Sequence, residues 1–153
     1  MRQNIKFSHW IKWPDRNKLN DLQYPGVYAI AYNKNNVNNN RFDWIKEIIY
    51  IGMTNSKRGV KNRLRQFDDT ISRKRNNHGG AMRVRYKYKD YDDLIRHLYV
   101  AVCPFKCDVT SNKAKDLLIM GKVAEYEYIC FAEYVKGFGM LPEFNNKKLS
   151  SKK

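Results

Sequence analysis

Two tyrosines and one arginine stand at positions from which their side chains can meet. Tyr28 and Tyr50 each lie in a short apolar run that predicts a strand, and Arg63 follows on a stretch that predicts a helix. A guanidinium presents a fork of donors that matches phosphate oxygens and keeps its charge. A phenol has a pKa of about 10, so it acts as a base only where nearby cations or a metal lower that pKa. We therefore expect these side chains to share one crevice suited to phosphate chemistry.

The two tyrosines need neighbouring strands to bring them together. Residues 25–32 open with Pro and Gly and continue with apolar and aromatic residues, and the run at 47–51 is halted by a glycine. Residues 33–40 are almost entirely Asn and Lys, which suits a hairpin loop because Asn tolerates positive φ and bonds its own backbone. Strands joined by such a loop pair antiparallel. Tyr28 and Tyr50 should then face one another.

The arginine needs a helix directly after the second strand. Residues 57–69 set basic side chains around an apolar stripe, which predicts an amphipathic helix with one buried face. Thr54 or Ser56 is expected to cap it by accepting first-turn amides. The stripe expected to face the core is Val60, Leu64 and Phe67.

A longer helix is predicted over residues 113–136, after a Ser-Asn cap signal and before Gly137. Glu127 falls within its apolar stripe, where a carboxylate is too costly to leave without a cation, a metal or a donor. The residues alone leave a structurally paired glutamate and a functional one equally open. The stripe is Met120, Val123, Ala124, Cys130, Phe131, Tyr134 and Val135.

In this order and spacing, the residues resemble the signature of the GIY-YIG nucleases. The likeness covers residues 24–145, and the combination is more specific than either tripeptide alone. It rests on Gly26-Val27-Tyr28, Tyr50-Ile51-Gly52, Arg63, Glu127 and the ending Pro142-Glu143-Phe144-Asn145.

The resemblance implies a catalytic set for phosphodiester hydrolysis. In such a set Arg63 holds the scissile phosphate, Glu127 binds Mg²⁺ or Mn²⁺, and Asn145 braces the site. One of the two tyrosines, Tyr28 or Tyr50, deprotonates the attacking water, and the other holds the phosphate or the first tyrosine. The residues leave the choice between them open.

Two positions bear on which branch of the family the chain resembles. Some branches carry a lysine directly after the second motif, where this chain has Met53. Other branches use a histidine beyond the first helix, and His78 stands there beside two glycines. We expect His78 to be a proton carrier or a phosphate ligand; a loop histidine without a role is the alternative.

The composition points independently to a polyanionic partner. The 153 residues include 30 Lys plus Arg against 15 Asp plus Glu, a formal charge of +15, and the pI is about 9.8. Such a surplus repels itself unless a polyanion offsets it. Basic and aromatic residues alternate over 73–89, which suits a surface that follows a phosphate backbone. The residues expected to contact DNA are Gly52, Arg65, Arg73, Arg75, Arg83, Arg85 and Lys87.

The chain length suits a single α/β domain. We expect a small, mainly antiparallel, three-stranded sheet flanked by helices, formed by residues 24–146. An N-terminal extension at 1–23 precedes it, and a basic, disordered tail at 147–153 follows. Trp10 and Trp13 of the extension either pack under the sheet or stack on bases.

The sequence thus predicts a metal-dependent endonuclease acting on double-stranded DNA. Recognition elements folded into the catalytic domain favour a restriction enzyme, and a twofold homodimer is one way to cut both strands. Three cysteines without paired spacing and the lack of an apolar span favour a cytoplasmic protein with no membrane partner, and a restriction-type role implies a prokaryotic one. A repair or homing nuclease and a non-catalytic nucleic-acid-binding module remain alternatives.

Overall fold

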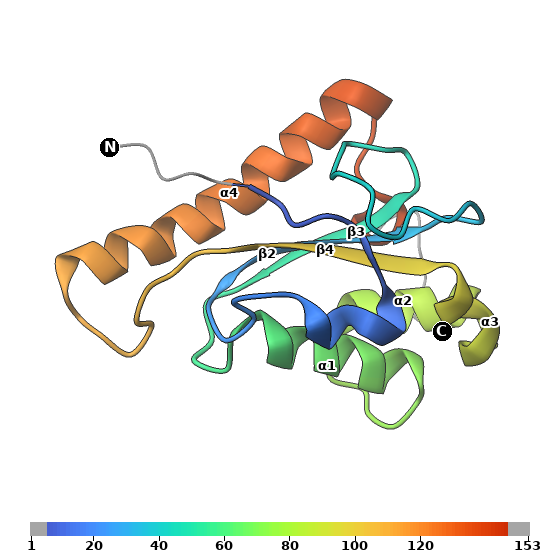
Figure 1. The fold of residues 1–153 in the computed structure, drawn as a ribbon, viewed down its shortest axis with the longest axis horizontal. Coiled ribbons are helices and arrows are strands. Elements are labelled where there is room, and N and C mark those ends of the chain that lie inside the picture. The colour runs from blue at the N-terminus through green and yellow to red at the C-terminus, as the bar shows by residue number, and fades with distance from the viewer. Residues whose placement is uncertain (1–5, 147–153) are drawn as a thin grey trace.

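The computed structural model describes residues 6–146, which form three layers (Figure 1). A four-stranded sheet lies in the middle, helix α4 (Ala114–Phe138) covers one face, and three shorter helices cover the other. No helix in this range is long and apolar enough to cross a membrane. The tail predicted at 147–153 lies outside the described residues, as do residues 1–5 of the extension.

All strand pairs are antiparallel, and the predicted pairing of the two tyrosine strands is confirmed. Tyr28 lies opposite Gly52 in the register, and Tyr50 lies opposite Ile30. Residues that face each other, and residues two apart on one strand, share a face of the sheet. Both tyrosines therefore point toward the layer of short helices. The strand order is β1 (Ile11–Lys12), β4 (Leu98–Pro104), β2 (Gly26–Tyr32) and β3 (Ile48–Thr54).

The short helices bury their apolar sides against this face of the sheet. The stripe predicted for the first of them is confirmed, because Val60, Leu64 and Phe67 are all buried in the core. Leu94 closes the same core from the last of the three. These helices are α1 (Gly59–Ile71), α2 (Gly79–Lys87) and α3 (Tyr91–Arg96).

The opposite face of the sheet is covered by α4. Val123, Cys130 and Tyr134 are buried there, as the predicted stripe requires. Ala124 and Val135 are exposed, so the prediction that they face inward was wrong. A helix lying on a sheet buries only the side that touches the strands, which makes the real stripe narrower than the apolar pattern.

The sheet has four strands rather than the predicted three. The additional strand, β1, comes from the N-terminal extension and pairs with β4, with Ile11 opposite Val100. A run of two residues carries no periodicity from which a strand can be predicted. Trp10 and Trp13 on either side of β1 are 2% and 0% exposed, so both pack in the core and the stacking alternative is not supported.

Helix α1 begins slightly later than predicted, and neither Thr54 nor Ser56 caps it. Its first-turn amides, those of Val60 and Lys61, donate instead to backbone carbonyls in the segment 22–24. The predicted cap was wrong because a contact with an earlier part of the chain already satisfies these donors.

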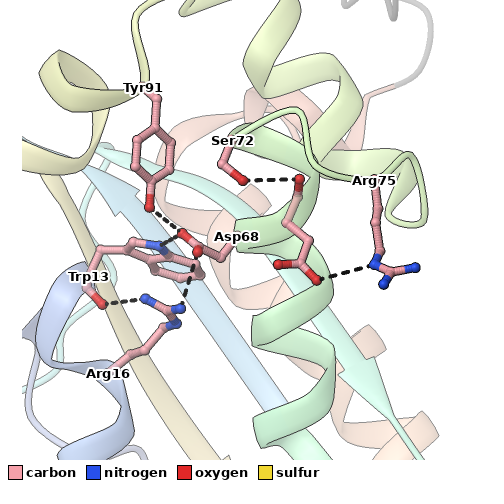
Figure 2. Close-up of polar contacts among 7 residues, drawn as sticks. Trp13, Arg16, Asp68, Ser72, Arg75 and Tyr91 are labelled. Carbon is pink, nitrogen blue, oxygen red and sulfur yellow. Dashed lines mark hydrogen bonds and ion pairs between the residues drawn. The ribbon is translucent and has the colours of Figure 1, made fainter.

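One carboxylate on α1 fastens the N-terminal segment to the helical layer (Figure 2). Asp68 Oδ1 accepts hydrogen bonds from Trp13 Nε1 and Tyr91 Oη, each at 2.8 Å, and Oδ2 lies 3.3 Å from Arg16 Nη2. The Arg16 guanidinium also lies over the Trp13 ring, 4.8 Å from its centroid. These contacts tie α1, α3 and the 3-10 turn η1 (Trp13–Lys18) together.

Candidate active site

Tyr28 and His78 form the buried centre of the site. Tyr28 Oη and His78 Nε2 are 2.9 Å apart. His78 also caps α2, because its Nδ1 accepts the amide hydrogen of Ala81 at 3.2 Å. Since Nδ1 is an acceptor, a neutral imidazole carries its proton on Nε2 and donates it to Tyr28 Oη.

Both ring nitrogens of His78 are thus engaged inside the protein, and the residue is buried. Burial, followed by the charges of Arg63 and Arg83, lowers the pKa of His78 to about 3. This geometry does not present the ring to a phosphate. It makes His78 a positioning residue that holds Tyr28 and the start of α2.

Tyr50 lies beside this pair, with its ring centroid 6.2 Å from that of Tyr28 and 5.4 Å from that of His78. Two glycines leave room for these rings. A Cβ atom on Gly52 would overlap Tyr28 Oη, and a Cβ atom on Gly80 would overlap the ring of Tyr50. The positions of both phenols therefore depend on two places in the chain that carry no side chain.

Arg63 approaches the same place from α1. Its Nη1 donates to Gln66 Oε1 at 2.7 Å and to the carbonyl oxygen of Asn77, next to His78, at 3.4 Å. Within residues 6–146 its guanidinium forms no ion pair. The neutral contacts orient the group while leaving its charge uncompensated.

Burial decides the ionisation of the two phenols. It raises the pKa of Tyr28 well above the ordinary value of 10.0, and Tyr50 raises that pKa further, whereas Arg63 lowers it. Burial likewise raises the pKa of Tyr50, against the lowering effects of Arg63 and Arg83. The guanidinium charges alone therefore do not bring the pKa of either phenol below its ordinary value, because desolvation outweighs them. The charge of Glu127 adds to the rise of the pKa at both tyrosines, so Glu127 interacts with them electrostatically.

Glu127 comes to the site from α4, on the far layer of the fold. Its side chain is half-buried, and burial raises its pKa. Among the described residues it accepts no hydrogen bond and forms no ion pair. A half-buried carboxylate without a partner is stabilised by any cation that reaches it.

The donor set around Glu127 restricts the kind of metal it can hold. The described part of the chain contains no group of three or more His, Cys, Asp or Glu residues that could ligate an ion. Mg²⁺ is commonly bound by one or two carboxylates together with substrate phosphate and water. One carboxylate without a protein partner, near guanidinium groups that form no ion pair among residues 6–146, fits that pattern and does not fit a metal held by the protein alone.

Asn145 braces the strand that carries the second tyrosine. Its Oδ1 accepts the amide hydrogen of Ile51 and its Nδ2 donates to the Ile51 carbonyl, both at 2.8 Å. Because β3 is an edge strand, Asn145 takes the place of a further strand at this point. Ile51 separates Tyr50 from Gly52, so the two bonds hold both in place.

Arg83 belongs to this site rather than to an outer DNA-binding surface. It is buried, and its Nε donates to the carbonyl oxygen of Phe144 at 2.9 Å. Its predicted place on the surface was wrong because residues 79–87 form a helix, which turns this side chain toward the sheet.

The other basic residues predicted to contact DNA lie outside the site. Lys87 is paired with Glu143 at 2.9 Å, and Arg85 donates to the backbone carbonyl of Thr70 at 3.2 Å. Gly52 is buried beneath the tyrosines rather than on the surface. The exposed members of the set are Arg65, Arg73, Arg75 and the paired Lys87.

The structure thus gathers most of the predicted catalytic residues in one place. Comparisons of the chain with protein-family models, with curated proteins and with solved structures returned no match. Arg83 and Gly80 are site residues whose roles were not predicted, although the two glycines after His78 were a visible signal of close packing. Tyr28, Tyr50, Arg63 and His78 lie together, Asn145 supports the strand beside them, and Glu127 acts on both phenols through its charge.

The state of His78 can be observed directly. Its lowered pKa of about 3, against an ordinary 6.5, predicts a neutral ring with the proton on Nε2 from pH 5 to pH 8. Since the unfolded chain gains this proton below about pH 6.5, folding stability should fall as the pH drops toward 3, by about 1.4 kcal/mol per pH unit from this group. Long-range ¹H–¹⁵N spectra of the imidazole test this. A titration of His78 with a midpoint near 6.5 would contradict the geometry described.

Proposed function

We propose that this protein is a metal-dependent DNA endonuclease of the GIY-YIG type. The observation that carries the proposal is the meeting of two phenols, an uncompensated guanidinium and an unpartnered carboxylate, supplied by β2, β3, α1 and α4. A protein that only binds nucleic acid would not require a half-buried carboxylate that acts on the same two phenols as the arginines. The formal charge of +15 supports a polyanionic substrate.

Arg63 and Arg83 are the phosphate-binding groups in this proposal. Both lie close enough to Tyr50 to act on its charged form, and neither is ion-paired within the described residues. A guanidinium stays protonated and offers several donors to phosphate oxygens. Donors that meet charge developing only in the transition state are commonly worth about 3 kcal/mol each.

Glu127 is the residue that would hold the divalent ion, Mg²⁺ or Mn²⁺. Such an ion supplies charge compensation at the phosphate and lowers the pKa of a bound water. Glu127 suits this role because it lacks a protein partner and lies beside the phenols. Its raised pKa is the electrostatic sign of a carboxylate that would gain from a cation.

We assign Tyr50, in its ionised form, as the group that takes a proton from the attacking water; its own proton must first pass to solvent, which the charges of Arg63, Arg83 and a cation held by Glu127 would favour. Tyr50 is partly exposed, whereas Tyr28 is fully buried and its Oη is engaged by His78. Burial raises the pKa of Tyr50, but Arg63, Arg83 and the Tyr28 hydroxyl all act to lower it. The Tyr28 hydroxyl, which His78 holds in position, thus stabilises the ionised form of Tyr50 by a hydrogen bond.

We also infer cleavage of restriction type, in which recognition and catalysis share one folded unit. The support for this is the N-terminal segment, which adds β1 to the sheet and places Trp13 in the core beneath it. Cleavage of both strands needs two active sites, which a twofold dimer would provide.

Substitution of Glu127 tests the proposed chemistry. Glu127→Ala should lower plasmid cleavage in the presence of Mg²⁺ at least about a hundredfold, because several kcal/mol of charge compensation are lost. DNA affinity should change little, since the variant loses a metal ligand and keeps the phosphate-binding groups Arg63 and Arg83. Nicking and linearisation followed on agarose gels, with and without a chelator, measure the effect.

Glu125→Ala is the matched control, because Glu125 is an exposed carboxylate on the same helix. It should cleave like the unmodified protein. Equal cleavage by the Glu127 variant would remove that residue from the reaction. If the unmodified protein binds plasmid but never cuts it under any divalent ion, the protein is a nucleic-acid-binding module instead.

The roles of the two phenols can be separated by removing one hydroxyl at a time. Tyr50→Phe should lower the single-turnover cleavage rate about 10²- to 10⁴-fold, the usual range for a lost general base. Tyr28→Phe should cost less, because it removes only the support of Tyr50. Rapid-quench measurements on both variants decide the matter, and a larger loss for Tyr28→Phe would reverse the assignment.

A further inference from the structure

A basic hollow of about 200 Å³ lies between η1 and the outer side of α1, away from the crevice. We call it the η1–α1 groove. Its lining contains arginine, lysine and asparagine and no acidic residue. The lining residues are Arg16, Asn17, Arg58, Lys61, Asn62 and Arg65.

The positive charge of this groove is largely uncompensated. Arg58, Lys61 and Arg65 are exposed, and in the described part of the chain none of them forms an ion pair. Arg65 Nη2 donates only to the neutral Asn62 Oδ1, at 2.6 Å. Cations crowded around one hollow repel each other, so their arrangement favours a bound anion.

One side chain that lines the groove is held in place before any ligand binds. Arg16 is held by Asp68 at 3.3 Å, by the carbonyl of Trp13 at 3.1 Å and by its position over the Trp13 ring (Figure 2). Asp68 is in turn bonded to Tyr91 on α3. An arginine immobilised in this way loses little side-chain entropy when it binds a ligand.

The segment predicted to bind DNA, 73–89, has only part of its charge free, because three of its basic residues are buried or lie close to a carboxylate. Arg83 is buried, Lys87 is paired with Glu143, and Arg75 lies 4.0 Å from a carboxylate of α1. What sets the η1–α1 groove apart is that its uncompensated cations surround one hollow, together with the immobilised Arg16.

The groove is also placed to extend the crevice. Successive residues of a helix are turned by about 100°, so Asn62 in the groove and Arg63 at the crevice lie on neighbouring faces of α1. A strand whose phosphate contacts Arg63 can thus continue across the outside of the same helix.

We propose that the η1–α1 groove binds the phosphate backbone of the DNA duplex next to the cleavage point. This inference rests on the proposed function for its substrate but concerns a separate surface. The N-terminal segment, through Arg16 and Asn17, thereby becomes part of the DNA interface as well as of the core.

Salt-dependent binding tests the groove without any cleavage. Binding of a fluorescent DNA duplex to the Lys61→Gln/Arg65→Gln variant is followed by anisotropy over a series of salt concentrations, in the absence of divalent ions. Loss of two phosphate contacts should lower the slope of log K against log salt by about 2. Both side chains are exposed and neither is ion-paired among residues 6–146, so the variant should melt at the same temperature as the unmodified protein.

Lys34→Gln/Lys122→Gln is the matched control, because it removes the same charge from two exposed lysines elsewhere. Its slope should equal that of the unmodified protein. An unchanged slope in the groove variant, or an equal fall in both variants, would overturn the proposal. Tighter binding of an RNA duplex of the same length, lost in the groove variant, would overturn the assignment to DNA.

The two proposals fail in distinguishable ways. A reduced slope in a protein that never cuts plasmid would keep the groove and reject the nuclease. Plasmid cleavage with an unchanged slope in the groove variant would keep the nuclease and reject the groove.

Discussion

Close packing around two residues without side chains is the constraint on which the site depends. Gly52 on β3 and Gly80 on α2 lie where a methyl group would overlap Tyr28 or Tyr50. Because neither glycine has a Cβ, α2 approaches the sheet closely enough for His78 Nε2 to lie 2.9 Å from the Tyr28 hydroxyl. The phenols are therefore held by the strand register and by the helix layer together.

That packing determines the electrostatics of the site. Burial raises the pKa of both phenols, and the arginines beside them oppose this without reversing it. The protein by itself thus holds neutral phenols next to an unpartnered carboxylate. An anionic substrate and a cation would complete the charge balance of such a site, which is the electrostatic argument for the proposed function.

Sequence patterns correctly predicted those elements of the fold that interactions between residues close in the chain determine. The strands with Tyr28 and Tyr50 and the buried side of α1 follow from apolar periodicity and hairpin chemistry, and both are confirmed. Strand β1 was missed because its two residues form a strand only through their pairing with β4. The cap of α1 was mispredicted because a distant carbonyl segment satisfies its amides.

The site was predictable only in outline, for a related reason. Arg83 was placed on the surface because alternating basic and aromatic residues suggested an outer face, whereas the helical turn of α2 directs it inward. His78 was expected near the reaction, but its hydrogen bond with Tyr28, 50 residues away in the chain, comes from a partner that no local spacing reveals. The η1–α1 groove likewise joins segments whose contact depends on the Asp68 network.

A crystal structure with Mn²⁺ and a short DNA duplex would show whether these side chains act on one phosphate. We expect one anomalous peak at the Glu127 carboxylate, with a DNA phosphate between it and Arg63 and with Tyr50 facing that phosphate. Mn²⁺ bound at other acidic residues, with Glu127 uncoordinated and the DNA away from the tyrosines, would contradict it.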